Sequence, residues 1–394
     1  MARRVLAISR VGFLGGAERI LLNCAQGAHQ HNFATVLACP APGALADEAA
    51  RHGITVIPTH IDRSKTSFSP REWLRLRQAL QRGAQEILDI ATRNAIGVLH
   101  AHHPIGALYA LKAARQLQLP LILHVHEALP LPPLYALVAR WVMPHCALFI
   151  GVSAAGCALI RRLGVSEPRV RLIYNSVDPK FLAHPQPVAE LARERAGAGP
   201  HIGLFGVLEP RKGQEDFLQA AAALKERHPQ AQFWVVGGLS FAENHAYHQR
   251  LQQLAQQSGL AGRVHFTGHC SNVPQWMAGM DMVVLASRAR ESLPTVLIEA
   301  AALSKRLVAT DVGGVREIVH DSQTGLVVAP GNPTALAAAM DRMLQPAGAR
   351  MAECAGRDAR QRFAPERFNE QIGAIYQSLL AGTPASQAPT EQAA

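Results

Sequence analysis

Short apolar runs typical of β-strands alternate with longer helical patterns along this chain, and the alternation occurs twice. In the first half, strands are predicted at Val5–Ser9, Thr35–Ala38, Thr55–Pro58, Val98–His100, Leu121–Val125, Leu148–Val152 and Arg171–Ile173. In the second half, they are predicted at Ile202–Phe205, Gln232–Val236, Val264–Thr267, Met282–Ala286, Leu307–Thr310 and Gly325–Val328. Most of these runs are continuously apolar, as expected for parallel strands covered on both faces. The pattern therefore predicts an α/β protein with two doubly wound parallel sheets.

A change in composition predicts where the two domains divide. The segment 179–200 is rich in Ala, Pro, Gly and charged residues, and we expect it to connect the domains. An N-terminal domain over 1–180 and a C-terminal domain over 181–365 follow from that position. Apolar spacing further predicts an amphipathic helix over 366–381, which we expect to pack back on the N-terminal domain. The Ala-, Pro-, Gln- and Thr-rich segment 382–394 is expected to be disordered.

Charge differs between the two halves. The formal net charge is +10, and residues 1–180 account for all of it, with 20 Lys and Arg against 10 Asp and Glu. A basic half suits an anionic membrane surface, nucleic acid or an acidic substrate, although solubility alone would also explain it. Nucleic acid is not an expected partner, because aromatic residues make up only 5% of the chain and no recognised nucleic-acid motif appears.

The cysteines and the N-terminus indicate the compartment. The six cysteines form no CxxC pair and show no regular spacing, which favours a reduced chain. The first apolar run ends at Arg10 after about five residues, too short for a signal-peptide core of roughly seven or more. We therefore expect a cytoplasmic protein that could lie at the inner face of the plasma membrane.

Two segments of the first half have features of membrane-surface elements. Residues 71–82 interleave arginines with leucines and Trp73, so they could lie on an anionic membrane, and they equally suit an ordinary covering helix. Residues 129–143 are apolar and include Tyr135 and Trp141. This second segment could form an acceptor entry or dip into a membrane.

The loop after the strand at Met282–Ala286 contains candidate ligand-binding residues, because ligands of open α/β sheets bind at the carboxyl ends of strands. Glu291 lies in this loop, Pro294 suits the first turn of a helix, and Glu299 lies early in that helix. Backbone N–H groups at the helix start would bind an anion, while the two carboxylates would accept hydrogen bonds from sugar hydroxyls. Alternatively, both glutamates only interact with the helix dipole on a solvated face. The residues expected to contact the ligand here are Ser292, Leu293, Pro294, Thr295 and Glu299.

Other strand ends of the second half carry basic residues and glycines. The first strand of this half leads into Gly206 and then into Arg211 and Lys212. An arginine fork beside a lysine point charge suits a diphosphate, although an isolated Arg-Lys pair is usually surface charge. Gly237 and Gly268 end the next two predicted strands and could frame a nucleotide base.

The loop after the first strand of the chain contains several glycines. Gly12, Gly15 and Gly16 lack the GxGxxG spacing of a nicotinamide-cofactor loop. We expect Gly12 to contact an acceptor substrate.

Two further strand ends of the first half carry imidazoles and one carboxylate: His100, His102, His103, His124, His126 and Glu127. Clustered His and Glu can bind a metal ion, but no helical HExxH pairing appears, so we predict no metal site. The predicted role is hydrogen bonding in a cleft, with His102, His103 and Glu127 contacting the acceptor. His100 and His124 could equally be structural.

The stretch 202–330 resembles the donor domain of family 4 retaining glycosyltransferases. That family has the GT-B fold, in which two Rossmann-like domains face a central cleft. The matching pieces are Glu-Pro-Arg-Lys-Gly (209–213), Val-His-Phe-Thr-Gly (264–268), the Glu-x7-Glu element (291–299), Ala-Thr-Asp-Val-Gly-Gly (309–314) with Glu317, and Thr-Gly-Leu-Val-Val (324–328). The first-half loop resembles a Gly-Gly-Ala-Glu-Arg element of these enzymes, which implies that Gly15 and Gly16 let the loop approach the donor phosphate and acceptor.

The resemblance implies a role for each matched polar residue. Arg211 and Lys212 would bind the donor diphosphate. Glu291 would contact the transferred sugar and Glu299 the ribose. His126 matches the histidine that related enzymes place beside the sugar. Glu291, His126, Arg211 and Lys212 are therefore the candidate catalytic residues.

The chain also departs from the family at a few positions. The family often has arginine at the position of Val207 and proline at that of Arg306, and it usually has glycine at Ser292 and Ser304. These departures bear on the identity of the donor more than on the reaction class.

The expected function is transfer of a sugar from a nucleotide-diphosphate sugar to a glycan or lipid-linked acceptor of the lipopolysaccharide or cell-envelope polysaccharide type. The resemblance implies retention of configuration at the anomeric carbon. No Asp-x-Asp motif is present, so Arg211, Lys212 and helix dipoles would neutralise the diphosphate without a metal. The nucleotide sugar would be a cosubstrate, and we expect no cofactor. A nucleotide-sugar 2-epimerase and a catalytically degenerate sugar-nucleotide-binding subunit are the alternatives.

Overall fold

The computed structural model describes residues 3–61, 70–126, 133–194, 199–239, 245–289 and 291–382, with only the backbone described for 70–76, 133–136 and 192–194. The chain divides into two compact units. Unit 1 comprises Met1–Asn175 and Pro365–Ala394, and unit 2 comprises Ser176–Ala364.

Unit 1 is built on a parallel sheet. Among its described residues, seven strands pair in the order β3-β2-β1-β4-β5-β6-β7. They are β1 (Arg3–Ile8), β2 (Phe33–Cys39), β3 (Thr55–Pro58), β4 (Val98–Ala101), β5 (Leu121–Val125), β6 (Leu148–Gly151) and β7 (Val170–Leu172). Strands β4, β5 and β6 are buried along their whole length. Burial on both faces explains why they read as continuous apolar runs in the sequence.

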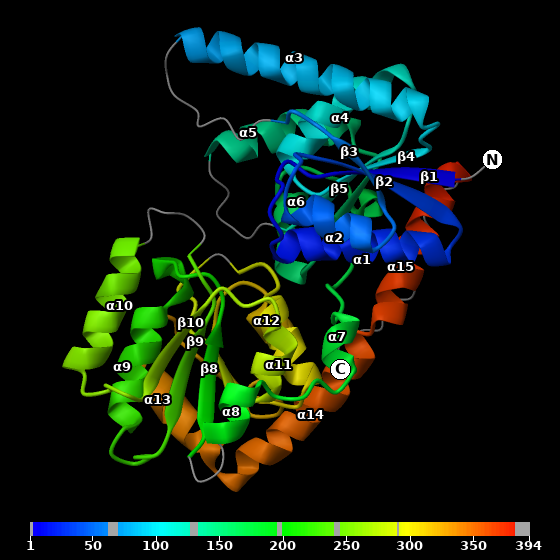
Figure 1. Ribbon diagram of the computed structural model, residues 1–394. Coiled ribbons are helices and arrows are strands. Elements are labelled where there is room, and N and C mark those ends of the chain that lie inside the picture. The colour runs from blue at the N-terminus through cyan, green and yellow to red at the C-terminus, as the bar shows by residue number, and fades with distance from the viewer. Residues whose placement is uncertain are drawn as a thin grey trace. The chain divides into compact units, whose positions relative to one another are not determined.

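Helices cover both faces of this sheet (Figure 1). They are α1 (Gly16–Gln30), α2 (Ala44–Arg51), α3 (Pro70–Arg93), α4 (Pro104–Gln116), α5 (Pro133–Val142), α6 (Ala154–Arg162) and α15 (Pro365–Leu380). Helices α1 and α15 pack together on one face, whereas α3, α4 and α5 contribute buried residues to the other. Helix α15 belongs to unit 1 because its buried Phe368, Ile372 and Tyr376 join the same cluster as Ile20 and Cys24 of α1.

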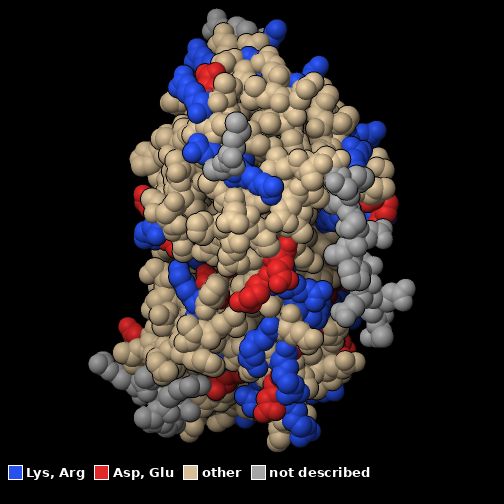
Figure 2. Space-filling view, turned by 90° about the vertical axis from the view of Figure 1, so that its right-hand side faces the viewer, with Lys and Arg blue, Asp and Glu red and all other residues tan. Residues whose placement is uncertain are grey.

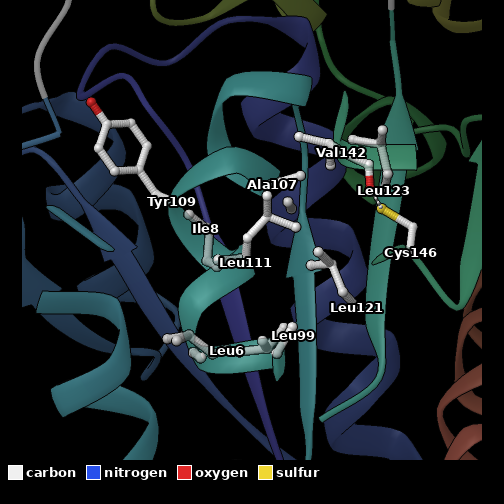
Figure 3. Close-up of a cluster of buried hydrophobic side chains, with 14 of the residues drawn as sticks. Leu6, Ile8, Leu99, Ala107, Tyr109, Leu111, Leu121, Leu123, Val142 and Cys146 are labelled. Atoms are coloured by element: carbon white, nitrogen blue, oxygen red, sulfur yellow. Dashed lines mark hydrogen bonds between the residues drawn. The ribbon is translucent and has the colours of Figure 1, made fainter. Parts of the chain in front are cut away.

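The core on the α4 face is aliphatic. Figure 3 shows Leu6 of β1 and Leu99 of β4 beside Leu111 of α4, and all three are buried. Complete burial of one such leucine stabilises the folded state by about 2 kcal/mol. The apolar periodicity of β1, β4 and α4 therefore determines which face of each element turns inward.

Unit 2 repeats this architecture. Among its described residues, six strands pair in the order β10-β9-β8-β11-β12-β13. They are β8 (His201–Phe205), β9 (Gln232–Val236), β10 (Val264–Gly268), β11 (Met282–Leu285), β12 (Arg306–Thr310) and β13 (Leu326–Val328). The helices are α7 (Pro179–Leu182), α8 (Ala189–Glu194), α9 (Gln214–Leu224), α10 (His245–Gln257), α11 (Val273–Ala278), α12 (Thr295–Ala302), α13 (Pro333–Leu344) and α14 (Pro346–Arg362). Helices α9, α10 and α13 share one core with the sheet.

The chain passes from unit 1 to unit 2 at Asn175, slightly before the boundary at 180 that the composition predicts. Helices α7 and α8 lie in the segment expected to be a connection, yet Phe181 and Leu191 are buried. Burial of these side chains places most of that segment in unit 2. The tail predicted over 382–394 lies outside the described residues except for Gly382.

Surface charge and helix hydropathy bear on possible partners. On the face shown in Figure 2, Lys and Arg lie in separate groups with Asp and Glu among them. Within the described ranges, no helix combines the length and apolarity needed to cross a bilayer.

Candidate active site

The strand orders of the two sheets indicate where ligands bind. In unit 2 the order reverses between the neighbours β8 and β11, and in unit 1 between β1 and β4. At such a reversal the loops leaving the two strands diverge to opposite faces, which opens a crevice at the carboxyl ends of the strands. Most candidate residues predicted from the sequence lie in the loops that follow these strands.

The loop after β8 ends in a short 3₁₀ turn, Pro210–Lys212, that presents Arg211 and Lys212. Gly213 follows with φ of 70° and occupies the N-cap position of helix α9. A Cβ atom at Gly213 would overlap the carbonyl oxygen of Ala286, at the end of β11. Glycine is therefore required here both for its backbone conformation and for the close approach of the two loops.

Side chains and backbone also join the loops after β8 and β11. Arg288 N–H donates to the carbonyl oxygen of Arg211 at 2.8 Å. The Arg288 guanidinium donates to both carboxylate oxygens of Asp216 in α9, at 2.8 and 2.7 Å. Asp216 is buried, so this bidentate pair fixes the start of α9 against the β11 loop.

Glu291 is the centre of a charged cluster at the strand-order reversal of unit 2, and the residue is buried at 7% exposure. Lys212 Nζ donates to Glu291 Oε1 at 2.6 Å, and Ser287 Oγ donates to the same oxygen at 2.8 Å. Arg211 Nη1 lies 3.8 Å from Glu291 Oε1, while Arg211 Nε donates to Glu209 Oε2 at 2.6 Å. The structure thus brings three of the predicted catalytic residues together: Glu291, Lys212 and Arg211.

The backbone of the loop after β12 packs against the backbone of Glu291 and Ser292. A Cβ atom at Gly313, where φ is 55°, would overlap the carbonyl oxygen of Glu291. Gly314 N–H donates to the carbonyl oxygen of Ser292 at 2.9 Å. Thr310 Oγ1 donates to the carbonyl oxygen of Ser287 at 2.5 Å. These contacts fix the position of the backbone of the Glu291 loop.

Helix α12 begins one residue later than Pro294 suggests. Pro294 occupies the N-cap position with extended backbone, and the helix runs from Thr295. Proline cannot continue a hydrogen-bonded turn, and its ring sets the entry angle of the chain without blocking the helix start. Glu299 lies further along the helix and is half-buried, whereas Ser292 and Leu293 are buried in the loop before it. Their expected ligand contacts stay predictions.

The glycines after β8, β9 and β10 lie side by side. Gly206 N–H donates to the carbonyl oxygen of Val236 at 2.9 Å, and Gly237 and Gly268 form a β-bridge. These residues expose backbone without side-chain bulk at the carboxyl ends of the strands, as framing a base would require.

The positions that depart from the family pattern have distinct local environments. Val207 contributes its carbonyl oxygen to Gln214 Nε2 at 2.8 Å. Ser304 follows α12 with φ of 51°, a left-handed conformation that explains why glycine suits that position. Arg306 Nε is buried without a hydrogen-bond partner among the described residues.

In unit 1, the glycine loop after β1 leads into α1. Gly15 occupies the N-cap position of α1, and its N–H donates a hydrogen bond to Glu18 Oε2 at 3.1 Å. Gly16 is exposed and begins the helix. Gly12 is held by contact with the next loop, where Leu45 N–H donates to its carbonyl oxygen at 3.0 Å.

The histidines predicted at the ends of β4 and β5 form one cluster. His102 Nδ1 lies 3.2 Å from His126 Nε2, within hydrogen-bond distance. The rings of His124 and His126 stack with centroids 4.3 Å apart. His100 Nδ1 forms a 2.7 Å hydrogen bond with the hydroxyl of Tyr376 in α15, which gives His100 a structural partner.

Burial favours the neutral form of His100, His102 and His124. It lowers the pKa of His100 to about 3, with repulsion from His126 as the smaller cause. Burial likewise holds the pKa of His102 and that of His124 well below the ordinary value, and repulsion among the neighbouring rings adds to the effect. A neutral ring can both donate and accept a hydrogen bond.

The structure describes only one of the two remaining residues predicted to contact the acceptor. His103 caps α4, because its Nδ1 accepts from Ile105 N–H at 3.1 Å. Glu127 lies outside the described residues. The acceptor contacts predicted for both stay predictions.

Sequence reasoning missed residues that act through the candidates. Ser287 positions Glu291, Asp216 and Arg288 join two loops, and Cys24 of α1 lies against the histidine cluster. The polar character of Ser287, directly before the Arg-Ala-Arg-Glu run, was a local signal. The other three are contacts between distant segments and leave no spacing pattern.

Two family models match the chain in consecutive regions. The model described as Glycosyltransferase Family 4 matches residues 14–181, and the model described as Glycosyl transferases group 1 matches residues 199–346. The second region contains Arg211, Lys212 and Glu291, the charged cluster of unit 2.

Similar proteins include sugar transferases of bacteria. An alpha-D-kanosaminyltransferase of Streptomyces kanamyceticus is 29% identical over 311 residues, which cover 73% of this chain and 79% of that protein. The lipopolysaccharide core biosynthesis mannosyltransferase LpcC of Rhizobium leguminosarum bv. viciae is 33% identical over 205 residues, which cover 50% of this chain and 57% of that protein. The crystal structure of HepE from Anabaena in complex with UDP-glucose matches with a TM-score of 0.79 at 25% identity, covering 95% of this chain and 99% of HepE.

Proposed function

This chain belongs to glycosyltransferase family 4 and has the GT-B fold, and from that premise we propose that it transfers a sugar from a nucleoside-diphosphate sugar to a glycan or lipid-linked acceptor. The observation that carries the proposal is the cluster of Arg211, Lys212 and Glu291 at the strand-order reversal of unit 2. Two cations beside a carboxylate suit a ligand with a diphosphate next to a sugar.

The proposed chemistry is stabilisation of a leaving group. Arg211 and Lys212 neutralise the charge that develops on the diphosphate, and the N-terminus of α12 adds the positive end of its dipole. Glu291, freed from Lys212 when phosphate takes its place, accepts a hydrogen bond from a sugar hydroxyl. Glu299 contacts the ribose. Transfer proceeds with retention and without a metal, and the role of His126 in unit 1 stays a prediction.

A lipid-linked or lipopolysaccharide acceptor is supported by the similarity to LpcC and by helix α5. Leu137 and Trp141, one turn apart on α5, are 66% and 61% exposed, and Arg140 between them is exposed as well. An exposed apolar pair beside a cation suits the surface of an anionic membrane. The described part of the other predicted segment, 77–82 in α3, also exposes Arg77 and Arg82, while the side chains of 71–76 lie outside the described residues.

A panel of nucleotide sugars, screened by thermal shift and then by product analysis, tests the proposed function. HepE binds UDP-glucose, so UDP sugars come first, followed by GDP and other sugar nucleotides. A bound donor raises the melting temperature of the wild type, because ligand binding stabilises the folded state. The variant Glu291→Gln should lose transfer. Absence of both a shift and transfer with every donor would refute the proposal.

Flotation with anionic liposomes tests the membrane contact separately. The wild type is expected to float with the liposomes at low salt. The double variant Leu137→Ser/Trp141→Ser is expected to remain in the bottom fraction of the gradient. The control is Leu172→Ser, which changes another exposed leucine of unit 1. Equal flotation of the double variant and the wild type would rule out α5 as the contact.

A further inference from the structure

Three buried side chains of unit 1 bring potential metal ligands together. The ligand atoms of Cys24, His102 and His124 all lie within 4.8 Å of one another. Their residues are 2%, 6% and 0% exposed. None of the three belongs to the donor cluster of unit 2, and a metal site here would revise two expectations from the sequence, that no metal binds and that His102 contacts the acceptor.

Strand alternation explains how the sequence builds this cluster. Side chains two residues apart on a strand share a face of the sheet. His100 and His102 therefore continue the face of Val98 in β4, and His124 continues that of Ile122 in β5. Helix α1 packs on this same face and brings Cys24 onto the imidazoles.

The imidazole nitrogens in this cluster point to a missing partner. Both ring nitrogens of His124 and Nε2 of His102 are buried without a hydrogen-bond partner among the described residues. Buried polar atoms nearly always have a partner, and an ion is one of the few explanations when they have none. The remaining nitrogen of His102, Nδ1, lies 3.2 Å from His126 Nε2. A histidine ligand typically donates its second N–H in this way, which leaves Nε2 facing the metal.

We propose that Cys24, His102 and His124 bind a thiophilic d10 metal ion, Cu⁺ or Zn²⁺. Bonds of about 2.0–2.3 Å require ligand atoms roughly 3.3–4 Å apart, so a shift of about an ångström in each ligand atom completes the site. A thiolate with two imidazoles selects these soft or borderline ions, and without a carboxylate among the three ligands it does not suit Mg²⁺ or Ca²⁺.

Charge balance favours Cu⁺ as the first ion to test. Binding replaces the S–H bond of Cys24 by a sulfur–metal bond, and the proton leaves to solvent. A thiolate and Cu⁺ are neutral together, whereas Zn²⁺ leaves one positive charge in a buried site. The ion links α1 to the ends of β4 and β5 and orients His126 through His102, while the sugar-transfer chemistry proposed for unit 2 does not depend on it.

Metal analysis of the full-length protein tests the proposal. Protein freed of metal by a chelator is titrated with Cu⁺ and with Zn²⁺ in separate arms, each against an indicator of known affinity. We expect about one equivalent of one ion to bind with a submicromolar Kd. The variant Cys24→Ser should bind it roughly 100-fold more weakly, and Cys157→Ser, which changes another buried thiol of unit 1, should match the wild type.

X-ray absorption at the edge of the bound ion, measured on the wild type, removes any dependence on the folding of Cys24→Ser. About one sulfur neighbour near 2.3 Å supports the site. The proposal is overturned if neither ion binds, if Cys24→Ser binds as tightly as the wild type, or if the spectrum contains no sulfur neighbour.

Discussion

Lys212 combines a structural and a chemical function at the scale of a single residue. Its ammonium lies 2.6 Å from Glu291 Oε1, so it compensates a nearly buried carboxylate before any ligand arrives. A diphosphate would compete with Glu291 for that ammonium. The same proton donor can therefore hold the site in shape and stabilise the leaving group.

Replacing Lys212 by Ala is expected to lower kcat about 100- to 1000-fold, because it removes one charge-assisted donor from the leaving group. Stability should fall by only about 1–2 kcal/mol, because Ser287 Oγ and Arg211 still face Glu291. Steady-state kinetics and urea unfolding measure the two effects, with Lys225→Ala as the control for loss of a lysine elsewhere in unit 2. Unchanged turnover in Lys212→Ala would remove Lys212 from the mechanism.

Gly313 and Gly262 form a matched pair for testing how the backbone positions Glu291. Both have positive φ, at 55° and 75°, but a Cβ at Gly313 would overlap the Glu291 carbonyl oxygen and a Cβ at Gly262 meets nothing. Gly262→Ala should cost about 1 kcal/mol from backbone strain alone. Gly313→Ala should cost several times more and also reduce transfer, as measured by urea unfolding and kinetics. Equal losses of unfolding free energy in the two variants would show that the loop after β12 can move to accommodate the added Cβ atom.

Sequence patterns predict residues whose role is local, and they miss those whose role depends on tertiary contact. Glu291 and Glu299 could be placed on either side of a helix start because Pro294 and the strand before it are local signals. The bond between Ser287 and Glu291 could not be predicted, because it depends on the loop conformation that Gly313 permits. The contact of Cys24 with the histidines depends on the packing of α1 on the sheet.

At the scale of elements, the strands were predictable because most of them contain an apolar run between polar loops. Strands β3, β5 and β9 match the predicted bounds, and β8 and β12 begin one residue earlier. The helix starts were harder, as Pro294 shows, since proline suits both the cap and the first turn. The position of one loop against another was not predictable, because it depends on contacts between distant residues such as Asp216 and Arg288.

The Asp216–Arg288 pair is expected to couple α9 energetically to the loop after β11. A double-mutant cycle of Asp216→Asn and Arg288→Gln should give a coupling energy of about 1 kcal/mol, at the lower end for close pairs, because Arg288 is partly exposed and therefore screened by solvent. The two variants should also raise KM for the donor, since the pair holds Arg211 in place through the Arg288 backbone. Additive effects in urea unfolding would show that the two loops are positioned independently.

At the scale of the whole molecule, two parallel sheets of the predicted class account for where the chemistry lies. In each sheet, loops that contain candidate residues lie at the strand-order reversal, and in unit 2 basic and carboxylate residues gather there. Unit 1 instead gathers neutral imidazoles between its sheet and the pair of helices α1 and α15. That burial has a consequence for the stability of the whole unit, because imidazole titrates near neutral pH when it is exposed.

Stability of the metal-free protein is expected to fall as the pH drops below about 6.5. Burial lowers the folded-state pKa of His100 to about 3 and holds those of His102 and His124 well below the ordinary value. At pH values between these pKa values and about 6.5, the histidines bind protons in the unfolded chain but not in the folded chain. Each histidine therefore lowers the free energy of unfolding by about 1 kcal/mol at pH 5.5. Urea unfolding of chelator-treated protein at pH 7.5 and 5.5 measures this loss. The drop in the free energy of unfolding between pH 7.5 and 5.5 should be about 1 kcal/mol smaller in His124→Gln than in the wild type. The control His29→Gln, which changes an exposed histidine, should behave as the wild type. The same loss in all three proteins would mean that His124 is protonated as readily in the folded chain as in the unfolded one.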